Sequence, residues 1–262
     1  MPKLAANLSM MFNELPFLDR FAAAAKAGFR GVEYLFPYEY PAADLAKRLA
    51  DNGLAQALFN MPPGDWAKGE RGLASLPGRV QEFRDGVAMA LDYAAALDCR
   101  LVHMMAGIPP QGTAHATAAA LYASNLAWAA ERAAAAGVRL ALEPINHRDM
   151  PGFHLNTMQQ AADIIAAIGA DRAGLQFDVY HCQITEGDVT KRMERFMPII
   201  AHMQIADVPA RNEPGTGELG WAYIFRRMDE LGYAGWVGCE YRPAAETVAG
   251  LAWRQQFNVC PP

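Results

Sequence analysis

Strand-like and helix-like segments alternate along the whole chain, and this alternation limits the possible fold more than any other feature. Short β-rich segments are followed by longer Ala- and Leu-rich segments of helical period, which is typical of βα units on a parallel sheet. Eight strands in such a pattern predict an α/β fold, the (β/α)₈ or TIM barrel, and no linker or charge block divides residues 1–262 into two domains. The expected strands are Leu4–Ser9, Gly31–Tyr34, Ala55–Asn60, Leu101–Met104, Arg139–Glu143, Gly174–Asp178, Ile199–Ile205 and Trp236–Tyr241.

The segments between the strands carry the boundary residues of helices. Pro41 precedes and Gly53 follows the expected helix Ala42–Asn52, in which Leu45 and Leu49 are spaced to lie on one face. The chain also resembles itself, since 28–34 and 232–241 each combine a helix stop, a strand and a late glutamate. Such an echo suits a fold built from repeated units.

Charge and composition exclude several classes of partner. The formal net charge is −5, whereas proteins that bind nucleic acid usually carry basic stripes, so we expect no nucleic-acid partner. We expect no membrane partner, because no uncharged apolar stretch approaches the ~18 residues of a membrane helix, and polar residues interrupt the N-terminal segment before a signal sequence can form. The Ala-rich helices are compatible with a homo-oligomer, but equally with packing within one barrel.

The cysteines are widely separated and show no CxxC spacing. We interpret them as reduced thiols of a cytoplasmic protein and not as a disulfide framework. They are Cys99, Cys182, Cys239 and Cys260.

Five of the expected strands end on or beside a side chain that can bind a metal ion or a polar ligand. The carboxyl ends of barrel strands, with the loops that follow them, form the active face. An unpaired buried carboxylate is costly, so acids at the ends of apolar strands need a cation or hydrogen bonds. The five side chains are Glu33, Glu143, Asp178, Gln204 and Glu240.

The last four of these positions are spaced by about one βα unit. Glu143 and Asp178 are 35 residues apart, Asp178 and Gln204 are 26 apart, and Gln204 and Glu240 are 36 apart. Three carboxylates and an amide oxygen form a hard oxygen set, which suits Mg²⁺ or Mn²⁺ better than zinc. We therefore predict one divalent metal ion, Mg²⁺ or Mn²⁺, on these four residues. The alternative is that each of them merely caps the junction of a strand and a loop.

The segments around these positions resemble those of a known family. Leu140–Asn146, Phe177–His181, His202–Asp207 and Gly238–Tyr241 occur in this order. They are similar to segments of the xylose isomerase-like barrels, and most closely of the hydroxypyruvate isomerase family, which includes 2-oxo-tetronate isomerases. The similarity covers nearly the whole chain. Related ketose epimerases usually have His as the third ligand, so Gln204 favours the hydroxypyruvate isomerase branch.

The resemblance implies a metal-dependent isomerase of a small 2-keto hydroxy acid. Hydroxypyruvate would become tartronate semialdehyde, or a 2-oxo-tetronate would become a 3-oxo-tetronate, with Glu143 and Glu240 as an acid/base pair that also contacts the metal. The residue types fit this reaction, because moving a proton between adjacent carbons through an enediolate needs a base and a positive charge near the oxyanion. Which glutamate removes the first proton, and whether the acid has three or four carbons, stays open.

Two residues near the motifs are candidates for binding the substrate. In related epimerases a histidine placed like His181 donates a hydrogen bond to a substrate oxygen; the alternative is a structural histidine. Arg211, in the loop after strand seven, suits the substrate carboxylate, because a guanidinium can bind it through two hydrogen bonds. A solvated loop arginine is the alternative.

Three further candidates rest on position alone. Asn60 and His103 lie at the ends of strands three and four, where they could contact the substrate or serve as a cap and a packed core imidazole. Glu70 lies beside Arg71 in a Gly- and Pro-rich stretch that could form a lid, with exposed loop charge as the alternative.

Other functions on the same barrel remain open at this point. An epimerase or dehydratase would use the same metal and carboxylates, and a sugar-acid binding protein would have kept the barrel without the chemistry. A metal-dependent repair endonuclease shares the architecture, but it typically needs several metals, many His ligands and a basic groove. The chain has 6 His and an acidic balance.

Overall fold

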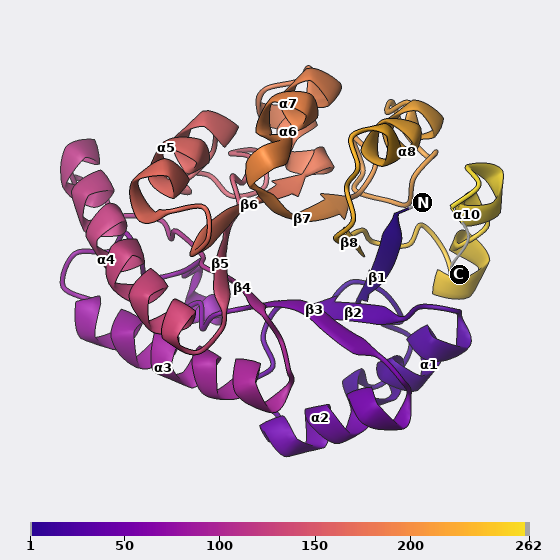
Figure 1. Ribbon diagram of the computed structural model, residues 1–262, viewed down its shortest axis with the longest axis horizontal. Helices are drawn as coiled ribbons and strands as arrows, with labels where there is room; N and C mark the ends of the chain where they lie inside the picture. Colours follow the sequence, from indigo (N-terminus) through magenta and orange to yellow (C-terminus); the bar gives the residue numbers. More distant parts are fainter. Residues whose placement is uncertain (1, 260–262) are drawn as a thin grey trace.

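The strands form a closed parallel barrel, as the alternation predicts. In the computed structural model, which describes residues 2–259, each strand pairs with the next in sequence and β8 pairs with β1. Figure 1 shows the helices around the outside of this ring, with the two termini on the same side of the molecule. The strands are β1 (Lys3–Asn7), β2 (Gly31–Tyr34), β3 (Ala55–Asn60), β4 (Leu101–His103), β5 (Arg139–Leu142), β6 (Ala173–Asp178), β7 (Ile200–Ile205) and β8 (Trp236–Cys239).

Helices cover the outer face of the barrel. In α2, Leu45 and Leu49 are buried, as their spacing predicts. The α-helices are α1 (Arg20–Lys26), α2 (Ala42–Asp51), α3 (Val80–Ala96), α4 (His115–Ala135), α5 (Met158–Ile168), α6 (Val179–Thr185), α7 (Val189–Phe196), α8 (Trp221–Glu230), α9 (Thr247–Gly250) and α10 (Trp253–Gln256). The 3₁₀ helices are η1 (Phe17–Asp19), η2 (Trp66–Lys68) and η3 (Met197–Ile199).

The strand boundaries differ from those predicted by at most two residues, and the difference matters at two positions. β5 ends at Leu142 and β8 ends at Cys239. Glu143 and Glu240, which were predicted inside these strands, therefore follow them directly. Both side chains stay buried at the mouth of the barrel.

The register of the parallel pairs sets which polar residues share a level of the barrel. Asp178 of β6 is paired with Gln204 of β7, and Gln204 is paired with Gly238 of β8. On the opposite side, Asn7 of β1 is paired with Glu33 of β2. Strand pairing thus places the polar side chains of Asn7, Glu33, Asp178 and Gln204 inside the barrel.

The described cysteines agree with the prediction of free thiols. Cys99, Cys182 and Cys239 are buried and unpaired, whereas Cys260 lies outside the described residues. Within residues 2–259, none of the helices combines the length and the apolar character that crossing a bilayer requires.

Candidate active site

A cavity of about 420 Å³ lies at the carboxyl end of the barrel. Loops after successive strands contribute to its wall, because residues at or beyond the ends of β3 to β8 all line it. Its polar lining includes Asn60, His103, Glu143, Gln176, His181, Arg211 and Glu240. The loops also contribute Arg71, Asp149 and Arg242 to this lining. This placement is the one in which barrel enzymes bind their substrates.

Glu143 has a buried carboxylate with few partners. His103 Nδ1 lies 3.4 Å from its Oε2, and His181 Nε2 lies 3.7 Å from its Oε1. No described residue hydrogen-bonds Oε1. Burial raises the pKa of Glu143 well above its usual value, and the neighbouring charges of Glu240 and Asp178 raise it further. These effects favour the protonated, neutral form of the carboxyl group.

Asp178 is held in place by the helix that follows it. Its Oδ1 accepts hydrogen bonds from the backbone N–H groups of Tyr180 (2.7 Å) and His181 (3.2 Å) and so caps α6. The other oxygen, Oδ2, has no hydrogen-bond partner among the described residues. It lies 3.7 Å from His181 Nε2 and 3.8 Å from Arg211 Nη2. One oxygen is thus structural, and the other is available to a ligand.

The surroundings of His181 determine which of its nitrogens carries the proton. Nδ1 lies 2.6 Å from Asn146 Nδ2 and 3.4 Å from the backbone N of Asn146. Burial, followed by the charge of Arg211, lowers the pKa of His181 well below its usual value, so the ring is neutral. With two donors at Nδ1, the proton is on Nε2, which faces Glu143 and Asp178. His181 is therefore arranged as a hydrogen-bond donor toward the cavity, and its binding of a substrate oxygen stays a prediction.

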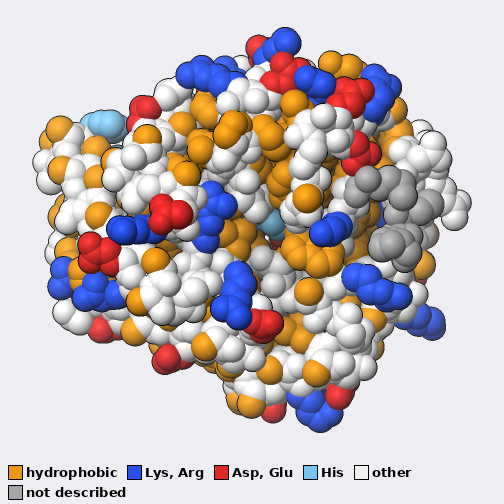
Figure 2. Space-filling model, in the orientation of Figure 1, with side chains coloured by type: hydrophobic (Ala, Val, Ile, Leu, Met, Phe, Trp, Pro, Cys, Tyr) orange, Lys and Arg blue, Asp and Glu red, His pale blue; other side chains and the backbone are white. Residues whose placement is uncertain are grey.

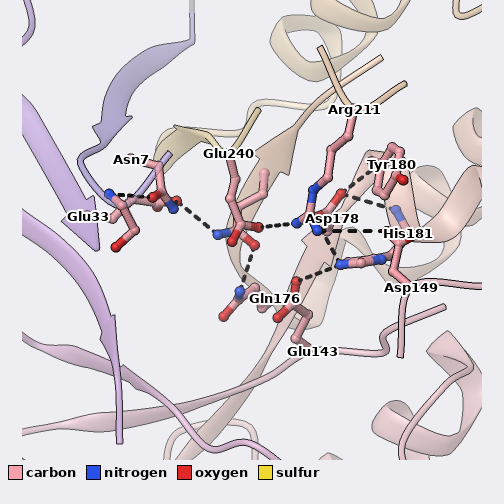
Figure 3. A network of polar contacts seen from close by, with 12 residues as sticks. Asn7, Glu33, Glu143, Asp149, Gln176, Asp178, Tyr180, His181, Arg211 and Glu240 are labelled. Carbon is pink, nitrogen blue, oxygen red and sulfur yellow. Dashed lines mark hydrogen bonds and ion pairs between the residues drawn. The ribbon is translucent and has the colours of Figure 1, made fainter. Parts of the chain in front are cut away.

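Arg211 lies among the carboxylates of the site, as Figure 3 shows. Its Nη2 is 2.9 Å from Glu240 Oε2, and its guanidinium also lies 3.8 Å from oxygens of Asp178 and Asp149. Burial alone would lower the pKa of Arg211, but Glu240 and Asp178 raise it above the usual value, and the group stays charged. The arginine predicted to bind a substrate carboxylate is thus already paired with acids of the protein.

Glu240 lies on the other side of this ion pair. Burial raises its pKa to about 8, although the neighbouring Arg211 acts in the opposite direction. A carboxyl group with a pKa near neutrality can both release and accept a proton at physiological pH.

A second group of polar side chains, none of which lines the cavity, surrounds Glu33 inside the barrel. Its Oε1 accepts hydrogen bonds from Asn7 Nδ2 (3.0 Å) and Gln204 Nε2 (2.9 Å), and its Oε2 lies 2.6 Å from His202 Nε2. A side chain at position 238 would collide with the Glu33 carboxylate, so Gly238 makes room for it. Asn7 and Glu33 lie apart from Glu143 and His181 in Figure 3. Glu33 is therefore a hydrogen-bonded structural carboxylate.

The structure corrects the placement predicted for Gln204. Its amide oxygen accepts a 2.6 Å hydrogen bond from Gln176 Nε2, and its amide nitrogen donates to Glu33. It does not line the cavity, whereas Gln176 does. The register places Gln204 beside Asp178, as its spacing along the sequence predicts, but its amide group binds Gln176 and Glu33 instead of lining the cavity.

The remaining substrate-binding candidates separate into two groups. Asn60 and His103 line the cavity, and burial lowers the pKa of His103 to about 3, so its ring is neutral. Glu70 does not line the cavity: its carboxylate binds Arg79 (2.7 Å) and the backbone N–H of Asp65. The prediction for Glu70 is wrong, because the loop directs this side chain toward α3, and its neighbour Arg71 lines the cavity instead.

Several residues of the site were missed. Gln176 lies two residues before Asp178 on β6, so the alternation of strand side chains could have placed it on the same face. His202 stands in the same relation to Gln204 on β7. Asn146 binds His181 across 35 residues of sequence, and no local pattern indicates that contact.

The unsatisfied polar atoms show where a cation would fit. Buried atoms without a hydrogen-bond partner include Glu143 Oε1, Asp178 Oδ2 and Gln176 Oε1. Glu143, Asp178 and His181 each present a ligand atom within 4.8 Å of the others'. Since the proton on His181 Nε2 makes this nitrogen a donor, the carboxylate oxygens fit a divalent cation best.

Comparison with known proteins identifies the family of this chain. A family model described as xylose isomerase-like TIM barrel matches residues 21–257. The chain belongs to this family. It is 56% identical over 257 residues to the 2-oxo-tetronate isomerase of Cupriavidus necator. The matched region covers 98% of this chain and 99% of that protein. The chain is 46% identical over 258 residues to the hydroxypyruvate isomerase of Escherichia coli, with coverages of 98% and 100%. These similarities show that the chain is an enzyme of the isomerase type.

A solved structure carries a different description. The crystal structure of an AP endonuclease, family 2, from Brucella melitensis is 48% identical, with a TM-score of 0.95 and coverages of 98% and 99%. That description applies to the Brucella protein. In the present chain, the face shown in Figure 2 carries Lys and Arg side chains interspersed with Asp and Glu. Within residues 2–259, only one group of three ligating side chains is close enough to hold a metal ion.

Proposed function

We propose that this isomerase interconverts a small 2-keto hydroxy acid and its isomer, either 2-oxo-tetronate and 3-oxo-tetronate or hydroxypyruvate and tartronate semialdehyde. The observation that carries the proposal is the pair of buried glutamates, Glu143 after β5 and Glu240 after β8, which line one cavity and have raised pKa values. Relatives whose names specify these two reactions are 56% and 46% identical to this chain.

The reaction needs a proton to move between two adjacent carbons. One glutamate removes the proton from the carbon that carries the hydroxyl group, and the electrons of that C–H bond form a double bond to the carbonyl carbon. The carbonyl oxygen becomes the second enediolate oxygen. Return of the proton to the former carbonyl carbon, with transfer of the proton of the original hydroxyl to the former carbonyl oxygen, completes the isomerisation. Glu143 and Glu240 are the two groups that can hold and return this proton.

Other side chains orient the substrate and stabilise the charge. His181 donates from Nε2 toward an oxygen of the substrate, and Arg211 stabilises the ionised form of Glu240, which is the form that acts as a base. Met105, Ile145 and Met150 also line the cavity and limit the access of water to the enediolate.

We further propose that Glu143, Asp178 and Glu240 hold one Mg²⁺ or Mn²⁺ ion, which would supply positive charge beside the substrate oxygens. The fit rests on the free oxygens of Glu143 and Asp178. Gln204 would join them only by giving up its hydrogen bond from Gln176. Because Arg211 lies against Asp178 and Glu240, its guanidinium neutralises the carboxylates in the arrangement described.

Proton NMR of the reaction mixture tests the proposal. Metal-stripped protein is incubated in D₂O with hydroxypyruvate or with a 2-oxo-tetronate, each with and without Mg²⁺. We expect metal-dependent formation of the isomer from at least one acid. Expulsion of a hydroxyl group or inversion of a carbon would instead identify a dehydratase or an epimerase, and two unchanged spectra would refute the proposed substrates.

A further inference from the structure

Two of the three arginines that line the cavity have no acidic partner among the described residues, and Arg71, in the loop between β3 and α3, is one of them. It lines the cavity together with Arg211 and Arg242. Arg211 is paired with Glu240, Asp178 and Asp149. A substrate carboxylate bound there would have to compete with three acids of the protein. Among the described residues, no carboxylate pairs with Arg71, because that of the adjacent Glu70 is bound by Arg79.

The side chain of Arg71 is held in position before any ligand binds. Its guanidinium carbon lies 3.7 Å from the centre of the Trp66 ring, and its Nη1 donates to the backbone carbonyls of Trp66 (3.1 Å) and Glu70 (2.8 Å). These bonds use one of the two terminal nitrogens. Stacking and two backbone contacts reduce the entropy that the side chain would lose on binding a ligand.

The loop on both sides of Arg71 is also fixed. Before it, Glu70 is bound by Arg79 and by the backbone N–H of Asp65. After it, the backbone N–H of Gly72 donates 2.8 Å to the carbonyl of Pro63, and Gly72 packs so closely on the backbone of Met105 that a Cβ would collide there. Gly72 has φ +112°, which a side chain rarely adopts. The loop is therefore a fixed wall of the site, and Arg71 is its inward-facing cation.

We propose that Arg71 binds the carboxylate of the substrate and thereby makes the enzyme selective for keto acids over neutral ketoses. The inference rests on the proposed acid substrate. The position fits that role, because the β3–α3 loop lies on the opposite side of the barrel from the Asp178 and Arg211 loops after β6 and β7. An acid held there by its carboxylate extends its carbonyl and hydroxyl groups toward Glu143 and Glu240. A planar guanidinium matches the two oxygens of a carboxylate.

The test compares Arg71→Gln and Arg71→Lys with Arg242→Gln, the other cavity arginine for which no acidic partner is found among the described residues. Binding of D-glycerate, which has the carboxylate and hydroxyl groups of the substrate but no keto group, is measured by calorimetry. We expect Arg71→Gln to weaken binding by tenfold to a hundredfold, and Arg71→Lys by less, since lysine keeps the charge without the fork. Arg242→Gln should weaken binding less than Arg71→Gln does. Circular dichroism and thermal unfolding check that each variant is folded.

Turnover adds a second readout. For the acid that the wild type converts, Arg71→Gln should raise KM by a similar factor with a smaller effect on kcat. The neutral ketoses dihydroxyacetone and erythrulose, in which a hydroxymethyl group replaces the carboxylate, should bind Arg71→Gln and wild type within threefold of each other. Unchanged glycerate binding in Arg71→Gln, or an equal loss in Arg242→Gln, would overturn the inference. Failure of the wild type to convert either acid would overturn the proposed function instead, because glycerate binding does not require turnover.

Discussion

Glu143 and Glu240 share burial but differ in their partners. Glu240 is in contact with a cation, Arg211, at 2.9 Å, whereas Glu143 lies beside the imidazoles of His103 and His181, which burial keeps neutral. We expect Glu143→Gln and Glu240→Gln each to lower kcat by at least about a hundredfold, because each removes a proton-transfer group. Steady-state kinetics on the converted acid, at saturating Mg²⁺ or Mn²⁺, measure the effect.

The matched control is Glu131→Gln, since Glu131 is exposed on α4. It should leave kcat unchanged, and all three variants should keep the far-ultraviolet spectrum of the wild type. Activity within about tenfold of the wild type corresponds to ~1.4 kcal/mol, which is too little for a main proton carrier and would remove that glutamate from the mechanism.

At the scale of the elements, the carboxylate of Glu33 ties three strands together inside the barrel. It joins β2 to Asn7 of β1 and to His202 and Gln204 of β7. Replacing Glu33 by Ala would leave these donors buried without partners. We expect Glu33→Ala to lower the free energy of unfolding by about 3 kcal/mol, as removal of one member of a buried polar network typically does. Urea denaturation measures the loss, and exposed Glu131→Ala should change stability by less than about 0.5 kcal/mol. A similar small change in Glu33→Ala would show that the network contributes no net stability.

One carboxylate in the loop between β7 and α8 accepts five hydrogen bonds. Asp207 accepts hydrogen bonds from the backbone of Val208, Gly215, Gly217 and Leu219 and from Trp221 Nε1. The same loop carries Arg211, whose backbone N–H donates to the Asp207 carbonyl and whose φ is +58°. The conformation that brings Arg211 to Glu240 is therefore maintained from Asp207.

We expect Asp207→Asn to lower kcat/KM by at least about tenfold, because its amide group faces several N–H donors and cannot accept from them all. Limited proteolysis with mass spectrometry should detect new cleavage between residues 208 and 219. Asp92→Asn, at an exposed position of α3, is the control. If Asp207→Asn shows wild-type activity and no new cleavage, the loop does not depend on this carboxylate.

For the whole molecule, the barrel could be predicted from the sequence because each βα unit carries its own local signals. Pro41 and Gly53, for example, bracket α2 without reference to the rest of the chain. The contacts inside the barrel carry no such signal: Glu33 and His202 meet across 169 residues. Glu70 and Arg71 are neighbours in sequence but face different surroundings, and only the packing of their loop decides which one reaches the cavity.

The stability of the whole barrel should respond to the metal ion. Burial, and after it the neighbouring acids, raise the pKa values of Glu143 and Glu240, so a cation that binds only the folded state relieves an unfavourable arrangement. At a hundred times its Kd, such a ligand adds about 2.7 kcal/mol, which corresponds to roughly 5 °C in Tm for a chain of this size. We expect Mn²⁺ or Mg²⁺ to raise the Tm of chelator-treated protein accordingly in differential scanning calorimetry. Asp178→Asn keeps the oxygen that caps α6 and removes the charge, so the variant should fold but show no rise in Tm with the metal ion. The control Asp92→Asn should show the same rise in Tm as the wild type. A full shift in Asp178→Asn would place the ion elsewhere, and no shift in the wild type would mean that Arg211 alone compensates the carboxylates.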